Sequence, residues 1–222
     1  GDLRILSAHR DGHLPRLAVS SYDDVLALIN AQNASAVAWS QRLSPRMLLE
    51  LLEVSGAWTS AFIESLDPHA PALFAVAWAG ESESANWMDT GREYTERWHH
   101  QMQIRDAVGA PPLLLEREWL EPLLDFALRA LPRAYASLAT PAGTSLVLRV
   151  GEDAWSLVRD ESRWELFSGA AASPSATVHL PPAVSWQLLF NTLPGGRARD
   201  AVRVEGDAAL AEPLFGARAV MV

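Results

Sequence analysis

The chain has 222 residues, a formal net charge of −9 and a hydrophobic content of 49%, which suits one large domain or two small ones with a packed core. The negative charge argues against nucleic acid as a partner, and the absence of cysteine excludes disulfides, thiolate metal ligands and a cysteine nucleophile. No run of about 18 apolar residues is present and no signal peptide is recognisable, so we expect a cytoplasmic protein without a membrane span.

The first part of the sequence predicts helices. Residues 2–9 have the apolar spacing of the last turns of a helix, without a cap before them. A second helix is predicted over residues 21–43, where a capping-box pattern precedes a helical period. A third is predicted over residues 44–66, because Ser44 is a suitable N-cap and Pro45 suits the first helical position.

A loop rich in tryptophan and small residues is predicted over residues 72–89. Its two tryptophans, Trp78 and Trp87, allow two interpretations. Either they cover the mouth of a ligand pocket, or they pack over the end of the helices.

The next helix is predicted over residues 92–108, which neither Gly nor Pro interrupts. Thr90 and Glu93 fit a capping box at its start. Glu96 and His100 then lie one turn apart on one face, with Cβ atoms about 6 Å apart. That spacing suits two ligands of one divalent metal, and it equally suits a plain hydrogen bond on a solvated face.

Other residues of this helix divide between the core and the surface. Trp98 and Met102, one turn apart, are predicted to face the core, which sets His99 off the stripe formed by Glu96 and His100. Arg92 is a candidate for binding an anionic substrate, and its alternative role is that of an ordinary solvated arginine.

The remaining sequence predicts a last long helix over residues 116–135 and then a change to strands. The predicted strands are 145–150, 154–159, 163–167, 176–180 and 201–204, with helices at 182–193 and 206–215. The class indicated is α+β: a four-helix bundle followed by a small domain with helices on one face of an antiparallel sheet. We place the boundary near residue 137. Phosphate-binding loops, dinucleotide fingerprints and nucleophile elbows are absent from the sequence.

Four segments together carry a family resemblance: WAGE at 78–81, NWMD at 86–89, REYTERWHH at 92–100 and IRDA at 104–107. They resemble the mycothiol-dependent maleylpyruvate isomerase family of actinobacteria. The resemblance implies a DinB-like, metal-binding four-helix bundle over residues 1–136, N-terminally incomplete, and a domain similar to sterol carrier protein 2 over residues 137–222.

The resemblance also implies a divalent metal, usually zinc, held by Glu96, His100 and a histidine of an earlier helix. That third ligand is expected before residue 1, and His9 is the candidate within this chain. The family often has an acidic residue at the position of Gln103, which here becomes the candidate for supporting the ligands.

The function implied is that of an isomerase or S-transferase. The metal would bind the sulfur of mycothiol and lower its pKa, so that a thiolate attacks a small electrophilic, maleylpyruvate-like substrate. Trp78, Trp87 and Arg92 are the substrate-binding candidates.

Two other functions remain open. The C-terminal domain resembles a lipid carrier, so Trp186, Leu189 and Phe190 either line a pocket for an apolar ligand or form ordinary core. Alternatively, the helices form a metal-free bundle that serves as an interaction scaffold. The sequence leaves the oligomeric state undetermined.

Overall fold

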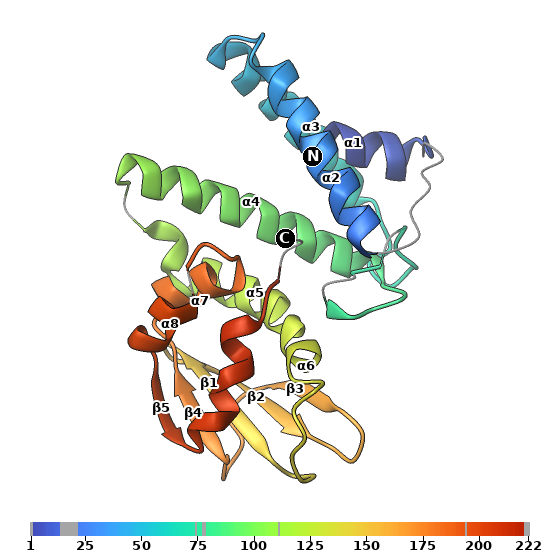
Figure 1. Ribbon diagram of the computed structural model, residues 1–222. Coiled ribbons are helices and arrows are strands. Elements are labelled where there is room, and N and C mark those ends of the chain that lie inside the picture. Colours follow the sequence, from blue (N-terminus) through green and yellow to red (C-terminus); the bar gives the residue numbers. More distant parts are fainter. Residues whose placement is uncertain are drawn as a thin grey trace. The chain divides into compact units, whose positions relative to one another are not determined.

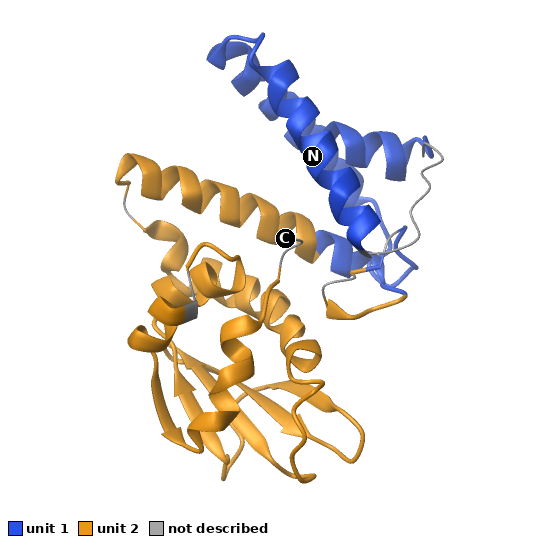
Figure 2. Ribbon diagram, viewed as in Figure 1, with its two compact units in different colours: residues 1–75, 83–90 blue, residues 76–82, 91–222 orange. Residues whose placement is uncertain are grey.

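The computed structural model describes residues 2–13, 22–73, 75–76, 79–110, 112–193 and 195–219. Its contacts divide the chain into two compact units (Figure 2). Unit 1 comprises residues 1–75 and 83–90, and unit 2 comprises residues 76–82 and 91–222. The described part of unit 1 consists of helices and loops with one isolated β-bridge between Pro71 and Ala85, whereas unit 2 combines helices with a five-stranded sheet (Figure 1). The predicted α+β class is therefore confirmed.

Unit 1 contains the helices predicted from the start of the chain. They are α1 (Asp2–Ile5), the π-helical turn η1 (Leu6–Arg10), α2 (Tyr22–Ser40) and α3 (Pro45–Glu64). The predicted cap of α3 is confirmed, because the Ser44 side chain accepts a hydrogen bond from the Met47 amide and Pro45 occupies the first turn. This cap satisfies one of the four amides that a helix start leaves unpaired.

Helix α4 (Asn86–Val108) begins earlier than predicted. The Asn86 side-chain amide donates to the Asp67 carbonyl at 2.9 Å, and the Asn86 backbone amide donates to Ala70 at 2.9 Å. These contacts within unit 1 fix the start of the helix, so the capping box predicted at Thr90 and Glu93 is wrong. Thr90 lies inside the helix, where its hydroxyl donates to the Asn86 carbonyl at 3.3 Å, a common alternative bond for threonine.

The helix predicted over residues 116–135 is divided into short segments in unit 2. These are α5 (Arg117–Ala127), η4 (Leu128–Ala130) and α6 (Leu131–Ala134), and a 3₁₀ turn, η3 (Leu113–Leu115), precedes them. Pro132 stands at the start of α6, and its ring clashes with the carbonyl four residues earlier in a regular helix. The 3₁₀ turn η4 precedes this position. The boundary predicted near residue 137 falls within unit 2, between α6 and the first strand.

The sheet of unit 2 has the order β3-β2-β1-β4-β5. Its strands are β1 (Ser145–Val150), β2 (Asp153–Arg159), β3 (Trp164–Ser168), β4 (Ala176–His179) and β5 (Arg203–Gly206). Three neighbouring pairs are antiparallel, but β1 and β4 are parallel, so the predicted purely antiparallel sheet is wrong. The connection from β3 crosses β2 and β1 before β4 joins the sheet beside β1.

Three helices complete unit 2: α7 (Pro182–Leu189), α8 (Gly195–Ala201) and the 3₁₀ segment η5 (Ala208–Gly216). Tyr135, which follows α6, is fully buried and connects distant parts of this core. Its hydroxyl donates to the Leu210 carbonyl at 2.8 Å, and its ring meets Trp164 of β3 edge-on at 5.3 Å. Desolvation raises the pKa of the Tyr135 phenol, which therefore remains neutral and keeps its donor.

Among the described helices, none combines the length and the apolar composition that crossing a bilayer requires.

Candidate functional site

The predicted pair on α4 is adjacent in the structure. His100 Nε2 lies 3.4 Å from Glu96 Oε2, and His100 Nδ1 lies 3.0 Å from Gln103 Oε1. The Glu96 and His100 side chains are 48% and 65% exposed, so a ligand can approach them from solvent. One helix face thus presents a carboxylate, an imidazole and an amide in a row, in the order that the sequence predicted.

Both ring nitrogens of His100 face oxygen acceptors, an arrangement that favours the doubly protonated ring. Hydrogen bonding to Glu96 accordingly raises the pKa of His100, and Gln103 adds to this effect. The same hydrogen bond is the main cause that lowers the pKa of Glu96, with a smaller contribution from the charge of Arg92. A metal ion at this pair would displace a proton from His100, because metals bind the neutral imidazole.

His99 has the opposite environment. Its ring is buried and stacks on His100 at 5.3 Å, and it contacts Phe190 at 4.9 Å and Trp186 at 6.1 Å. Burial lowers the pKa of His99, and the neighbouring charge of His100 lowers it further. Of these two consecutive histidines, His99 therefore has a lowered pKa and His100 a raised one.

We expect the two histidines to give the free energy of unfolding opposite pH dependences. The pKa of His99 is below the unfolded value of about 6.5, so its contribution is present above that pH and is lost as the pH falls below it. The pKa of His100 is raised, so its contribution is present below about pH 6.5 and is lost as the pH rises through the folded value.

Urea unfolding between about pH 5 and about pH 8, the range in which histidine titrates, tests this expectation. His99→Leu should flatten the acid side of the stability profile, and His100→Gln should flatten the alkaline side. Profiles of both variants that parallel the wild type would contradict it.

The donor set of the predicted metal centre is incomplete in the structure. Glu96 and His100 supply two donors, whereas a catalytic zinc site uses three protein ligands. No group of three or more His, Asp or Glu side chains with metal-binding geometry occurs among the described residues. His9, the candidate third ligand, belongs to unit 1, where its Nδ1 lies 3.7 Å from Asp89 Oδ2.

The remaining predicted site residues have separate environments. Trp78 lies outside the described residues. Trp87 is half-buried in the first turn of α4 in unit 1, where its amide donates to the Pro68 carbonyl at 3.0 Å. Arg92, in unit 2, has its Nε 3.8 Å from Glu93 Oε1.

The three residues considered for an apolar pocket under α7 have little exposed surface. Trp186, Leu189 and Phe190 are buried in the core, and Trp186 packs edge-on against Trp98 at 5.6 Å. Their burial agrees with the interpretation that these residues belong to the ordinary core. Trp98 and Met102 also face the core, as predicted.

A groove in unit 2 was not predicted from the sequence. It has a volume of about 850 Å³ and follows β3, with α5, η4 and α6 on its other side. It is lined by Ala79, Gly80, Glu81, Asp125, Arg129, Pro132, Ala136, Trp155 and every residue from Ser162 to Ser168. These residues come from three distant parts of the chain, so no local pattern indicates that they meet.

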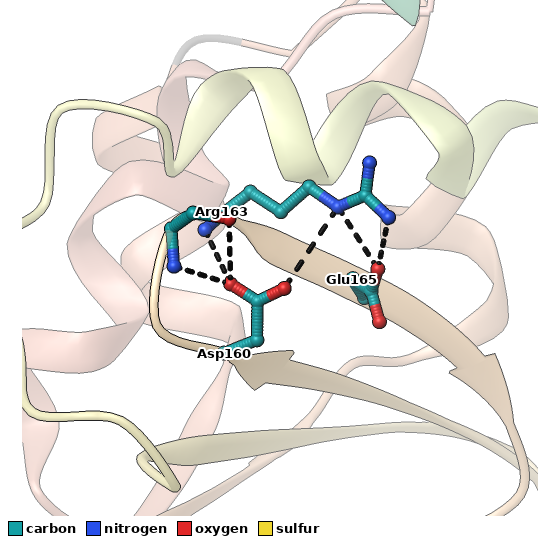
Figure 3. A network of polar contacts seen from close by, with 4 residues as sticks. Asp160, Arg163 and Glu165 are labelled. Atoms are coloured by element: carbon teal, nitrogen blue, oxygen red, sulfur yellow. Dashed lines mark hydrogen bonds and ion pairs between the residues drawn. The ribbon is translucent and has the colours of Figure 1, made fainter.

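Ion pairs and hydrogen bonds connect many of the polar groups at this groove. Asp125 accepts a hydrogen bond from the Trp155 indole at 2.6 Å. Figure 3 shows Arg163 reaching along β3 to Glu165, with its Nη2 2.5 Å from Glu165 Oε1, while Asp160 folds back onto the β2–β3 turn. The Asp160 carboxylate accepts hydrogen bonds from the backbone amides of Ser162 and Arg163, and these bonds lower the pKa of Asp160.

Comparison with known proteins gives a limited result. No family model matches the sequence, and no curated protein matches it. Among solved structures, similarity is found to the UbiJ-SCP2 ubiquinone synthesis protein, with 21% identity, a TM-score of 0.30, and coverage of 47% of this chain and 88% of that one.

Two insect proteins give similar values. For sterol carrier protein 2 like 2 from Aedes aegypti, identity is 22% and the TM-score is 0.28, with coverage of 38% of this chain and 84% of that one. For sterol carrier protein domain 2 of Helicoverpa armigera, identity is 14% and the TM-score is 0.29, with coverage of 45% and 79%. All three are sterol-carrier-type domains that match less than half of the chain, and at these TM-scores they carry no functional argument.

Proposed function

We propose that unit 2 is a small-molecule-binding module and that the groove along β3 is its binding site. The observation that carries this proposal is the groove itself, whose volume of about 850 Å³ lies within the usual range of ligand sites. Trp155, Trp164 and Phe167 line it together with seven polar or charged residues, a mixed composition that suits a ligand with both apolar and polar groups.

Filling the groove should weaken binding. Ala136 is exposed and lines the groove, whereas Ala139 is exposed and lies outside its lining. We expect Ala136→Trp to weaken binding of the dye anilinonaphthalene sulfonate about tenfold, which corresponds to about 1.4 kcal/mol, and Ala139→Trp to leave it unchanged. Dye titrations followed by fluorescence measure this, and native mass spectra of the purified protein report any retained ligand. Equal dye affinity in both variants would place the dye elsewhere and refute the assignment.

A second function is proposed for the pair on α4. Glu96 and His100 would contribute two ligands to a divalent metal, most simply zinc, in a mycothiol-dependent isomerase or S-transferase acting on a small electrophilic substrate. The observation in favour is the 3.4 Å approach of a solvent-accessible carboxylate and imidazole. The metal would lower the pKa of the mycothiol thiol, so that a thiolate exists at neutral pH. Glu96 and His100 would hold the metal in place.

Metal content tests this second function. We expect protein purified without chelator to bind about one equivalent of zinc, and Glu96→Ala and His100→Ala each to lower its affinity about tenfold or more. His69→Ala, which removes an exposed histidine from a loop of unit 1, should retain the metal. Elemental analysis and competition with a zinc-binding dye provide the measurement. Wild-type protein that takes up no zinc would leave Glu96 and His100 as an ordinary ion pair.

A further inference from the structure

The groove meets β3 along the edge of the strand. Successive residues of a strand point to opposite faces of the sheet, so a cavity over one face touches every second residue. Here every residue from Ser162 to Ser168 lines the groove, and β3 is the outermost strand of the sheet. The groove therefore contacts the strand from its open side, where the backbone is accessible.

The opposite wall is formed by the consecutive segments α5, η4 and α6 and the turn after α6, here called the helical ridge, and Ala79, Gly80 and Glu81 also line the groove. Asp125, Arg129, Pro132 and Ala136 line the groove, and their spacing of four, three and four residues is that of one helix face. The groove thus runs between a helical ridge and an open strand edge. The five residues of β3, at about 3.3 Å each, give the strand edge a length of about 17 Å.

The ladder between β2 and β3 determines which amides point into the groove. The Gly169 amide donates to the Ala154 carbonyl at 2.8 Å, and the Asp160 amide donates to the Arg163 carbonyl at 2.9 Å. Both pairs agree with the register of the two strands. Since hydrogen-bonded pairs alternate in an antiparallel ladder, the amide and carbonyl groups of Leu166 and Ser168 point away from β2. Within the described chain, no protein group forms a hydrogen bond with them.

The charged groups of the groove are already engaged by the protein. Asp125 binds the Trp155 indole, Arg163 pairs with Glu165 and Asp160 (Figure 3), and Glu81 and Arg129 have interactions of their own. The buried Trp164 indole N–H has no partner among the described residues. The other groups left for a ligand at the strand edge are neutral backbone donors and acceptors, repeated every second residue. An extended peptide presents the complementary groups at the same repeat.

We infer that the ligand of the groove is a free, uncharged oligopeptide of about five residues, which adds to β3 as a further strand of the sheet. This inference rests on the groove being the binding site of unit 2, as proposed above. Main-chain hydrogen bonds to Leu166 and Ser168 provide the affinity, and the space beside the helical ridge accommodates every second side chain of the peptide.

The probe is an end-blocked pentapeptide, acetyl-Thr-Val-Thr-Val-Thr-amide, with affinity measured by isothermal calorimetry. Two N-methylated versions provide the matched control: one methylated at its second and fourth residues, the other at its first, third and fifth. In an added strand only one of these sets faces β3, so one version should lose about tenfold or more in affinity and the other should stay within about threefold. Equal losses in both versions would overturn the strand-addition geometry.

Leu166→Pro and Leu166→Ala test the same contact from the side of the protein. Both remove the leucine side chain, but only proline removes the outward amide, and proline is tolerated on an edge strand where that amide is not part of the ladder. We expect Leu166→Pro to bind the peptide about two- to tenfold more weakly than Leu166→Ala, and equal peptide affinity of the two variants would contradict the main-chain contact. Circular dichroism confirms that each variant is folded.

The results distinguish failure of the peptide proposal from failure of the proposed binding site in the groove. Dye binding that Ala136→Trp weakens, combined with no peptide binding, would overturn the peptide and leave a small-molecule site in the groove. The absence of both dye and peptide binding would overturn the binding site itself.

Discussion

Trp186→Ala should lower the free energy of unfolding of unit 2 by about 3–5 kcal/mol, the usual cost of truncating a buried aromatic residue. Trp186 is 2% exposed and packs edge-on against Trp98. Because it also covers His99, its removal should admit water beside that ring and move the pKa of His99 upward, towards the ordinary value.

Urea denaturation, and the titration of His99 followed by NMR, measure both effects. Trp119→Ala is the matched control, because Trp119 is 39% exposed on α5 and its truncation should cost less than about 1 kcal/mol. A small loss of stability for Trp186→Ala, accompanied by weaker dye binding, would show that Trp186 lines a ligand pocket after all.

Gly91→Val should destabilise unit 2 by about 3 kcal/mol, at the upper end of the usual cost of overpacking. A Cβ atom at Gly91 would lie 2.3 Å from Cδ2 and 2.5 Å from Cε2 of Phe126, which is itself buried. The ring has to move, and the close approach of α4 to α5 is lost with it. The small gain in helix propensity when glycine is replaced, well under 1 kcal/mol for valine, does not offset this cost.

Gly196→Val provides the matched control, because Gly196 lies in helix α8 and a Cβ atom there meets nothing within 4 Å. Its urea midpoint should stay equal to that of the wild type or rise slightly. If the two valine variants unfold at the same denaturant concentration, α4 and α5 do not approach each other at Gly91 as described.

Features that depend on short-range chemistry were predicted well. The Ser44–Pro45 start of α3 follows from capping and from the fixed φ angle of proline, and the strands β1 and β2 follow from their β-forming residues. The adjacency of Glu96 and His100 needs only helical geometry. Their role as metal ligands stays a prediction, because that role depends on a ligand that these two residues do not supply.

Features that depend on distant parts of the chain were not predicted. Contacts of Asn86 with Asp67 and Ala70 set the start of α4, and a local capping pattern at Thr90 gave no hint of them. The parallel pairing of β1 with β4 and the groove along β3 depend in the same way on segments that meet only after folding. The low pKa of His99 has a similar origin, because the side chain that buries its ring, Trp186, belongs to α7.

The bond between Tyr135 and Leu210 has a consequence for synthesis of the chain. It joins residues 75 positions apart, and the entropy of closing so long a loop is lost before the buried contacts compensate for it. On the ribosome, this part of the core stays open until residue 210 has left the exit tunnel. Before that point the unfinished sheet exposes apolar surface and unpaired strand edges, the features that make folding intermediates prone to aggregation.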